Sequence, residues 1–450
     1  MKKTLLILSA CSLICVGIFA TAKDRYSELQ IFAKVLNLVQ KYYVENVDTK
    51  KLIYGGIKGM LRELDPHTNF LSPEIYKEFE SETSGQFGGL GVEITVKEGI
   101  LTVISPIEDT PAWKAGIKAG DKIVSIGKVS TKGMSLVEAA KHMRGRRGTK
   151  VILGIFREGF EEPKDIPVVR GTVKIKSVKY TDLEEGYGYF KVTHFIENTT
   201  RDMMKLINKH KKKHKNIKGL IIDLRKNPGG LLDQAVKMSD FFLEKGNIVS
   251  TRDRSGKDPE IVSATKDGTL SKFPLIVLID EFSASASEIV AGALQDNKRA
   301  LIMGERSFGK GSVQSVVKLG DGSGLKLTVA RYFTPSGRSI QAEGIAPDVV
   351  VENLDQAVLE SARLKKKVKR EIDIKGHLAS DKEKKAKKAK DKSNSLLGFW
   401  WTGDDAEKVK KKTPKAKLLT KDFQARQAYN YLRAWSVMDT FDQVPEKLKR

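Results

Sequence analysis

The chain has few cysteines and histidines, the residues on which many enzymes depend for catalysis or metal binding. Its 450 residues include two cysteines, Cys11 and Cys15, and both lie in an apolar stretch near the N-terminus. The remainder therefore offers no disulfide framework, no cysteine ligand for a metal and no cysteine nucleophile. The six histidines form no His-Glu-x-x-His or comparable ligand spacing. We accordingly expect no metal site.

For four of the histidines we expect a structural role and not a catalytic or metal-binding one. His67 falls in a turn-rich segment, and we expect it to be a turn residue and not a catalyst. His194 stands between bulky residues of a strand-like run, which favours a place in the core. His210 and His214 belong to the basic run 209–215, which is typical of a solvated helix face.

Positive charge is the strongest bias of the composition, with a formal net charge of +24. Such a balance is typical of proteins that bind nucleic acid, an anionic membrane surface or acidic partners. Much of it lies in a lysine-rich, low-complexity segment, 365–417, which we expect to be solvated or disordered. Aromatic residues that stack on bases are sparse there, with one cluster at 399–401. We expect no specific nucleic-acid partner, and a surface-binding role of this segment stays open.

The N-terminus has the pattern of an export signal. Lys2 and Lys3 precede an apolar run, 5–19, and Ala-Thr-Ala at 20–22 follows it. This order is typical of a secretory signal peptide with an Ala-x-Ala cleavage site. We predict a signal peptide over 1–22 and export to the cell envelope. An uncleaved membrane anchor is the alternative, although the run is short for a full span; a lipoprotein site at Cys11 fits poorly because apolar residues follow it.

Hydrophobic periodicity divides the rest of the chain. Residues 23–84 carry apolar residues at helical spacing and predict a helical region. Residues 85–172 mix strand-like runs with helical stretches. In 173–364 strands alternate with helices, which indicates an α/β layer whose sites lie beyond the strand ends. A helical period returns in 418–450. The fold class is α/β multidomain.

A glycine-rich loop, Gly-Gly-Leu-Gly-Val at 88–92, enters a strand of the second region. Its bare amides can form a nest for the terminal carboxylate of a peptide, which could then add to the strand edge. Alone, such a loop is usually a plain tight turn. With Ala-Gly-Ile-Lys-Ala-Gly-Asp-Lys-Ile at 115–123, however, the region resembles a PDZ domain, β-rich with two helices. The resemblance assigns the carboxylate loop to Gly89, Leu90, Gly91 and Val92.

Serines at a strand-to-helix junction are the first candidates for chemistry. The run 273–279 predicts a buried strand, and Ser283–Asp296 predicts a helix that opens on small residues. Free N–H groups and the dipole at such a helix start favour developing negative charge. A serine hydroxyl needs a base to take its proton, and no histidine stands near these serines in the sequence.

Lys310 and Gln314 are the polar groups that follow. A lysine can act as a base when burial or adjacent positive charge keeps it neutral. The small neighbours Gly309, Gly311 and Ser312 would let Lys310 approach closely, and Gln314 could orient its amine. A solvated lysine and a glutamine packed at a strand edge would explain the same residues without catalysis.

Asn-Pro-Gly-Gly at 227–230 follows the predicted buried strand 219–225 and precedes a predicted helix. The turn exposes backbone N–H groups at a helix start, and an oxyanion-binding role explains its doubled glycine. A plain strand-to-helix turn is the simpler alternative.

The segments Ser283–Asp296, Phe308–Gln314 and Asp223–Gly230 closely resemble those of the carboxy-terminal processing peptidases, or tail-specific proteases. Similar motifs at 64–67, 88–94 and 344–348 extend the resemblance over residues 26–363. It implies a PDZ domain inserted before an α/β serine protease core. It also implies the roles of particular residues: Ser285 as nucleophile, Lys310 as general base, Gln314 as the group that positions it, and backbone N–H groups of Ala286 and of Gly229 or Gly230 as the oxyanion hole.

The resemblance further implies that the enzyme needs no cofactor. It would bind the C-terminal tail of a protein, often an apolar one, through its PDZ domain and cleave nearby in the periplasm. An adaptor, a homo-oligomer and membrane association through the N-terminal segment stay open. A catalytically silent PDZ scaffold is the alternative function, against which the intact Ser285, Lys310 and Gln314 argue. The departures are Lys226, the run 280–282 and the lysine-rich segment, and none of them replaces a residue that carries the chemistry.

Overall fold

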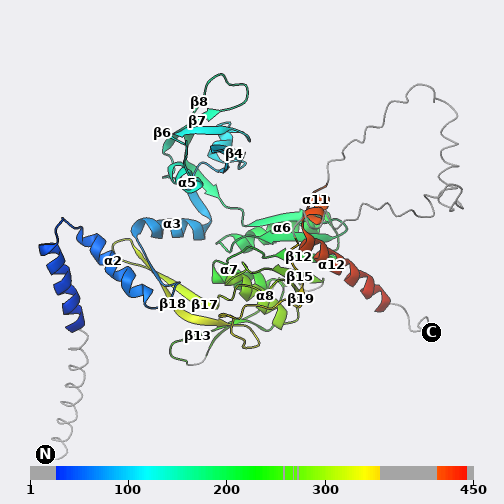
Figure 1. The fold of residues 1–450 in the computed structure, drawn as a ribbon. Helices are drawn as coiled ribbons and strands as arrows, with labels where there is room; N and C mark the ends of the chain where they lie inside the picture. The colour runs from blue at the N-terminus through cyan, green and yellow to red at the C-terminus, as the bar shows by residue number, and fades with distance from the viewer. Residues whose placement is uncertain (1–26, 257–258, 267, 271–272, 355–412, 443–450) are drawn as a thin grey trace, which may run out of the picture. The chain divides into compact units, whose positions relative to one another are not determined.

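The structure, a computed structural model, describes residues 27–442 except for 257–258, 267, 271–272 and 355–412 (Figure 1). The predicted signal peptide and most of the lysine-rich segment therefore lie outside the described residues. The chain forms two compact units. The first comprises the residues up to Glu82 with Thr251–Asp258 and Ser312–Arg331, and the second comprises the rest. No helix in the described ranges is long and apolar enough to cross a membrane.

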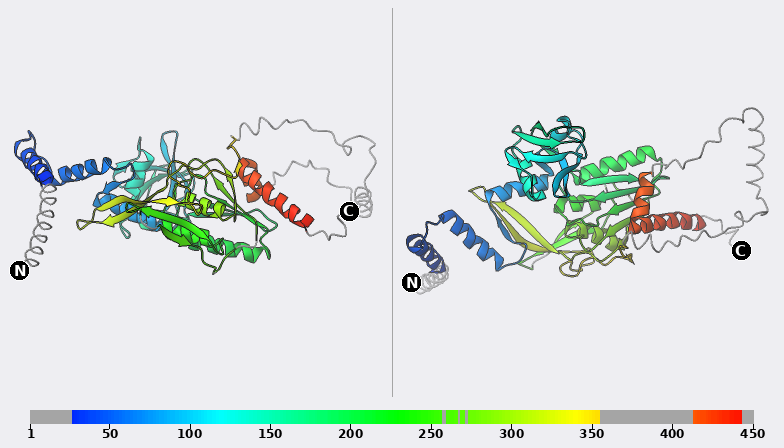
Figure 2. Two further views of the ribbon diagram at one scale, coloured as in Figure 1. Left: turned by 90° about the horizontal axis from the view of Figure 1, so that it is seen from below. Right: turned by 45° about the horizontal axis from the view of Figure 1, so that its top comes forward.

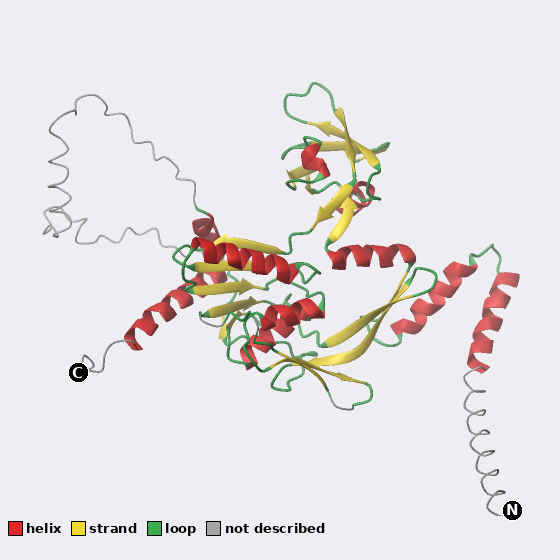
Figure 3. Cartoon of the chain, turned by 180° about the vertical axis from the view of Figure 1, so that it is seen from behind, coloured by secondary structure: helices red, strands yellow, loops and turns green. Residues whose placement is uncertain are grey.

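The first unit combines helices with an antiparallel hairpin, seen as the two long strands in Figure 3. A first helix covers 27–42, and Asp48 caps the next one through a 2.9 Å bond from the amide of Lys50. Strand β18 pairs antiparallel with both β1 and β17. These findings confirm the predicted helices. The labelled elements are α2 (Thr49–Arg62), β1 (Asn69–Leu71), α3 (Pro73–Ser84), β17 (Ser312–Lys318) and β18 (Gly324–Phe333).

In the second unit, the first part is β-rich with two short helices, as predicted. Its sheet has the strand order β3-β4-β5-β7-β8, with β6 beside β5, and β2 pairs with β9 separately. Leu90, Ile123 and Leu153 are among the buried residues of its core. The elements are β2 (Gln86–Gly89), β3 (Val92–Lys97), β4 (Ile100–Pro106), α4 (Pro111–Lys114), β5 (Lys122–Ile126), β6 (Val129–Ser130), α5 (Leu136–Met143), β7 (Lys150–Phe156), β8 (Lys164–Val169) and β9 (Gly171–Lys174).

An α/β layer follows, with the strand order β10-β11-β12-β15-β16-β19. All these strands pair in parallel except β10, which is antiparallel to β11. Every residue of β12 and β15 is buried, because a parallel sheet is covered on both faces. The strands are β10 (Val178–Asp182), β11 (Tyr187–Val192), β12 (Gly219–Asp223), β15 (Leu275–Ile279), β16 (Leu301–Gly304) and β19 (Val349–Val350); β13 (Asn247–Asp253) and β14 (Glu260–Ser263) belong to another sheet.

The C-terminal helices complete this layer (Figure 2). Ala428 and Leu432 of α12 are fully buried in one cluster with Ile221 of β12. Because side chains alternate along a strand, Leu220 and Ile222 face the other side of the sheet. The resumption of helix after the lysine-rich segment is therefore confirmed. The helices of the layer are α6 (Thr199–Lys213), α7 (Leu232–Asp240), α8 (Ala286–Asp296), α11 (Pro414–Lys421) and α12 (Phe423–Asp442).

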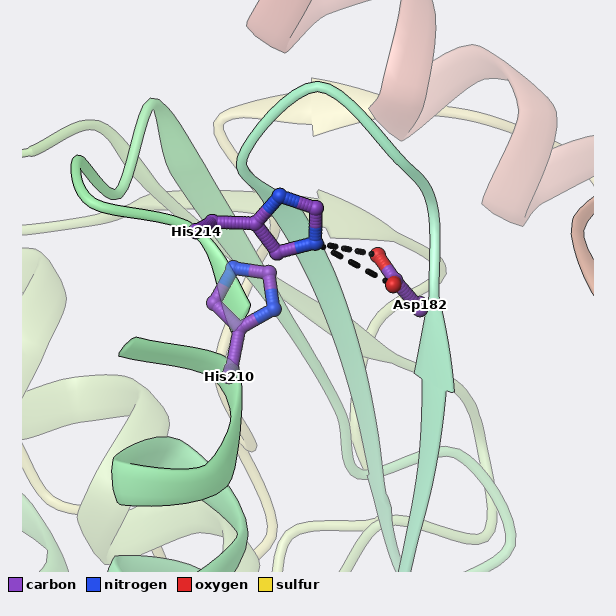
Figure 4. Close-up of side chains that lie close together, drawn as sticks. All are labelled: Asp182, His210 and His214. Carbon is purple, nitrogen blue, oxygen red and sulfur yellow. Dashed lines mark hydrogen bonds and ion pairs between the residues drawn. The ribbon is translucent and has the colours of Figure 1, made fainter. Parts of the chain in front are cut away.

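Two predictions about histidines are wrong. His194 is exposed, because β11 ends at Val192 and the alternation that would have buried it ends there too. His210 is fully buried, because this face of α6 packs on β10; its Nδ1 lies 2.7 Å from the Tyr180 hydroxyl. His214 lies 3.1 Å from both carboxylate oxygens of Asp182 (Figure 4).

These three side chains could in principle hold a metal ion. Each already has protein partners, however. The Nε2 of His210 lies 3.2 Å from the Gly186 carbonyl, and Lys213 Nζ lies 2.5 Å from Asp182. Their contacts are thus explained as hydrogen bonds and ion pairs that join the end of α6 to β10.

Candidate active site

The serine motif forms a strained turn between β15 and α8. Ser285 is half-buried and has φ 54°, in a region that residues with a side chain seldom adopt. The carboxylate of Asp280 accepts hydrogen bonds from the amides of Phe282 and Lys226, and Ser283 Oγ donates to the Leu224 carbonyl at 2.9 Å. The turn is therefore held against the end of β12. A sharp strand-to-helix turn that presents a serine is a known way to expose a nucleophile.

The Asn-Pro-Gly-Gly turn lies directly beside this serine. The carbonyl of Asn227 accepts bonds from the amide of Ala284 at 3.1 Å and from Ser287 Oγ at 2.9 Å. Gly229 has φ 102°, and a Cβ there would lie 3.0 Å from both the Cβ of Ser285 and the amide nitrogen of Ala286. Only glycine allows this approach.

Of three backbone N–H groups at this junction, one is bonded within the turn and two have no acceptor among the described residues. The amide of Gly229 is buried and donates to Asn227 Oδ1 at 2.9 Å. Gly230, by contrast, is exposed. The residues on either side of it bond to Phe195: the carbonyl of Gly229 accepts from the Phe195 amide, and the amide of Leu231 donates to the Phe195 carbonyl. Within the described part of the chain, the N–H groups of Gly230 and of Ala286, the first residue of α8, have no protein acceptor. The geometry therefore favours Gly230 over Gly229 as an anion-binding donor, a choice that the sequence left open.

Glu288 connects the serine turn, 280–285, to the lysine loop, 305–311. The sequence analysis missed this role. Its Oε2 accepts from the amides of Ser285 at 2.7 Å and Lys310 at 2.9 Å. Its Oε1 accepts from the amide of Gly309 and from Ser307 Oγ, both at 2.6 Å. Burial raises the pKa of Glu288, although these donors favour its charged form. The Ser-x-x-Glu spacing, which is typical of a helix start, was the signal that could have identified it.

Lys310 is half-buried in the loop between β16 and β17. The amide of Phe308, two residues earlier, donates to the carbonyl of Ser283 at 3.0 Å. Gly311 is needed because a Cβ there would lie 2.4 Å from the backbone nitrogen of Gln341. The lysine loop is thus bound to the serine turn at two places, through Ser283 and through Glu288.

Gln314 belongs to the other compact unit, on β17. It stands at a break in the register between β17 and β18. Its Nε2 donates to Ser312 Oγ at 2.8 Å and lies 3.2 Å from the Ser312 carbonyl. Its assignment to the lysine stays a prediction from the resemblance.

The predicted carboxylate loop connects β2 to β3. Leu90 is buried as an anchor, and Gly91 has φ 74°. The carbonyl of Gly91 accepts from the amide of Ile107 at 2.9 Å, and a Cβ on Gly91 would lie 2.3 Å from the Cβ of Thr110. In this part of the structure the amides of Leu90 and Gly91 have no protein acceptor. Gly89 ends β2, and Val92 begins β3.

A strained serine beside open amides indicates a serine hydrolase, and the comparisons with known proteins narrow that class. Residues 186–351 match the model of peptidase family S41, and residues 102–157 match that of the PDZ domain. Residues 19–74 match the activating protease CtpB N-terminal domain. The chain is a serine peptidase with a PDZ domain, a module that binds peptide or protein tails.

Two sequence relatives identify the family, and one solved structure is also similar to the chain. The carboxy-terminal-processing protease of Bartonella bacilliformis is 41% identical over 428 residues, 95% of this chain and 93% of that protein. The carboxy-terminal processing protease CtpA of Bacillus subtilis is 37% identical over 342 residues, 76% and 72% of the two chains. The solved photosystem II D1 C-terminal processing protease is 33% identical, with TM-score 0.44 over 72% of this chain and 93% of its own. The protein belongs to the carboxy-terminal processing proteases.

Proposed function

We propose that the protein is an exported endopeptidase that cleaves peptide bonds with Ser285 as nucleophile and Lys310 as base. The observation that best supports this proposal is the carboxylate of Glu288. One of its oxygens accepts hydrogen bonds from the amides of Ser285 and Lys310, so both backbones lie within 3 Å of a single atom. This connection holds the backbone of the lysine loop beside the serine turn, as a serine–lysine pair requires.

The proposed reaction follows from these positions. Lys310 takes the proton of the Ser285 hydroxyl, and the oxygen attacks the carbonyl carbon of the substrate. The amides of Gly230 and Ala286 donate to the oxyanion, and removing one such donor typically costs about 2.7–4 kcal/mol of transition-state stabilisation. Lys310 then returns the proton to the leaving amine, and water hydrolyses the acyl-enzyme in a second round. Gln314 keeps the role of orienting the amine, by resemblance to the family.

The substrates that we propose are proteins with apolar C-terminal tails. The terminal carboxylate would meet the open amides of Leu90 and Gly91, and the tail would extend along β3. A bound tail places the rest of the substrate near the protease core at a high effective concentration.

The test compares wild type with Ser285→Ala and Lys310→Ala on an unfolded protein that ends in apolar residues. Both variants should lose cleavage. Ser263→Ala and Lys237→Ala, which change exposed residues outside the site, should keep it. Equal cleavage by all five proteins would overturn the assignment. Tail binding without cleavage by wild type would instead favour the silent scaffold.

Export is proposed from the N-terminal pattern alone. The protein isolated from the cell envelope should begin at Lys23 if the Ala-x-Ala site is used, which N-terminal sequencing will show. Full-length protein that stays in the membrane pellet would indicate an anchor. Recovery in the cytosolic fraction would refute export.

A further inference from the structure

We infer that Asp422, at the start of α12, is a positioning residue for the Asn-Pro-Gly-Gly turn, 227–230, which we call the oxyanion turn. It acts through Arg225. This inference rests on the proposed function of that turn. It also makes the C-terminal helix part of the catalytic core, although the match to peptidase family S41 ends at residue 351.

The guanidinium of Arg225 lies between two carboxylates from distant parts of the chain. Its Nε and Nη2 donate to Asp223 at 2.8 and 2.9 Å. Nη1 and Nη2 donate to Asp422 at 3.0 and 2.6 Å, and Nη1 also donates to Gln424 Oε1 at 2.7 Å. All five N–H donors of the side chain are therefore used, and three of the acceptor atoms belong to two residues about two hundred positions away.

Charge balance makes the contribution of Asp422 necessary. The side chain of Arg225 is 9% exposed and that of Asp223 is fully buried. Lys191 lies 3.4 Å from Asp223, so the cluster contains two cations. Asp422 supplies the second carboxylate and makes the cluster neutral. Without its charge, a nearly buried cation would lose one of its two carboxylates, which is strongly unfavourable.

The cluster lies at the base of the oxyanion turn. Arg225 lies two residues after the end of β12, and its own amide donates to Asp223 Oδ1 at 2.9 Å. Lys226 comes next in the left-handed conformation, φ 60°. Asn227 then holds Gly229 and the serine turn. A shift of Arg225 would therefore move the amide of Gly230 relative to Ser285.

The packing of α12 determines where Asp422 lies. Its Oδ1 caps the helix by accepting from the amide of Ala425 at 2.9 Å. Ala425, Ala428 and Leu432 are fully buried against the sheet. The Nε2 of Gln424 donates to the Val351 carbonyl at 2.6 Å. Because the helix is anchored in this way, it can hold Arg225 in one place.

The test uses the full chain with Asp422→Asn, which keeps the size and the helix cap but removes the charge. The matched control is Lys415→Ala on the neighbouring α11, which removes an ion pair to Glu184 without touching Arg225. We expect Asp422→Asn to lower kcat about 10- to 100-fold with KM changed less than about threefold, because the interaction acts on the transition state. Lys415→Ala should keep kcat and lower the unfolding temperature less than Asp422→Asn does, because the Glu184 side chain is largely exposed.

A second readout separates positioning from loss of folded protein. Binding of a peptide boronate, which forms a tetrahedral adduct on the serine, should weaken by the same factor as kcat. Binding of a non-covalent product peptide should not change. If Asp422→Asn does not fold, Asp422→Glu keeps the charge and serves the same test: it should lower kcat without lowering the unfolding temperature.

Wild-type kcat in the folded Asp422 variants would overturn this inference, and so would an equal loss in Lys415→Ala. The Ser285→Ala variant keeps the two proposals distinguishable. If it is inactive while Asp422→Asn is fully active, only the role of Asp422 fails. If Ser285→Ala is active, the proposed function itself fails.

Discussion

Replacing Glu288 by glutamine should reduce catalysis far more than stability. Each oxygen of this carboxylate accepts two hydrogen bonds, from Ser285 and Lys310 on one side and from Ser307 and Gly309 on the other. In glutamine an NH2 group replaces one oxygen and faces two donors. At least one buried amide then lacks an acceptor, whichever way the side chain turns, because a backbone N–H cannot accept.

The size of the effect follows from that lost acceptor. Leaving a buried donor unsatisfied costs about 1–3 kcal/mol, and about 1.4 kcal/mol corresponds to a tenfold change in rate. We therefore expect kcat to fall about 10- to 100-fold, since the lost bond is one of the four with which Glu288 joins the serine turn to the lysine loop. Burial raises the pKa of Glu288, so its charge costs free energy at neutral pH, and the neutral glutamine removes that cost. The unfolding temperature should therefore change little.

The assay measures kcat and KM on a peptide substrate together with the thermal unfolding of each variant. Glu281→Gln is the matched control, because that side chain is exposed next to the same turn. A Glu288→Gln enzyme with wild-type kcat would refute the reasoning. A loss of kcat no larger than the loss of folded protein would show that the carboxylate serves stability alone.

Two further predictions concern single positions. Gly230→Ala should displace its own N–H, because φ is 142° and a Cβ would lie 2.1 Å from the Phe195 carbonyl oxygen. We expect kcat to fall about 100- to 1000-fold, the effect of losing one oxyanion donor. Gly337→Ala, also at positive φ but with open space around it, should have a kcat close to that of wild type. Burial lowers the pKa of His210 in the folded protein. As pH falls through about 6.5, this histidine is therefore protonated in the unfolded chain before it is protonated in the folded one. The free energy of unfolding should then decrease by at most about 1.4 kcal/mol per pH unit. Urea unfolding between pH 7.5 and 5.5 should show a smaller decrease for His210→Gln, and an equal slope in both proteins would contradict this.

Features that depend on neighbouring residues could be predicted from the sequence. The apolar runs of β12 and β15 predict strands buried on both faces, and the small residues from Ser283 onward predict a helix start. Glycines such as Gly91 and Gly229 indicate tight turns, because glycine adopts positive φ angles more easily than any other residue. For the same local reason the order of these motifs was sufficient to indicate the family.

Features that depend on distant residues could not be predicted in this way. The burial of His210 depends on the packing of α6 against β10, and the exposure of His194 depends on where β11 ends. Glu288 meets Lys310 across 22 positions, and Arg225 meets Asp422 across 197. No local pattern encodes such hydrogen bonds, since they exist only once the strands have paired.

The oxyanion turn shows both parts of this division. By itself the sequence predicted that a doubled glycine would expose backbone amides at a helix start, and the resemblance to the family implied that they lie beside a serine. Only the tertiary structure decided which amide is open, because the Asn227 side chain turns back onto Gly229 and leaves Gly230 facing outward. The direction of that side chain depends in turn on its bond to the Val192 carbonyl, on the neighbouring strand β11.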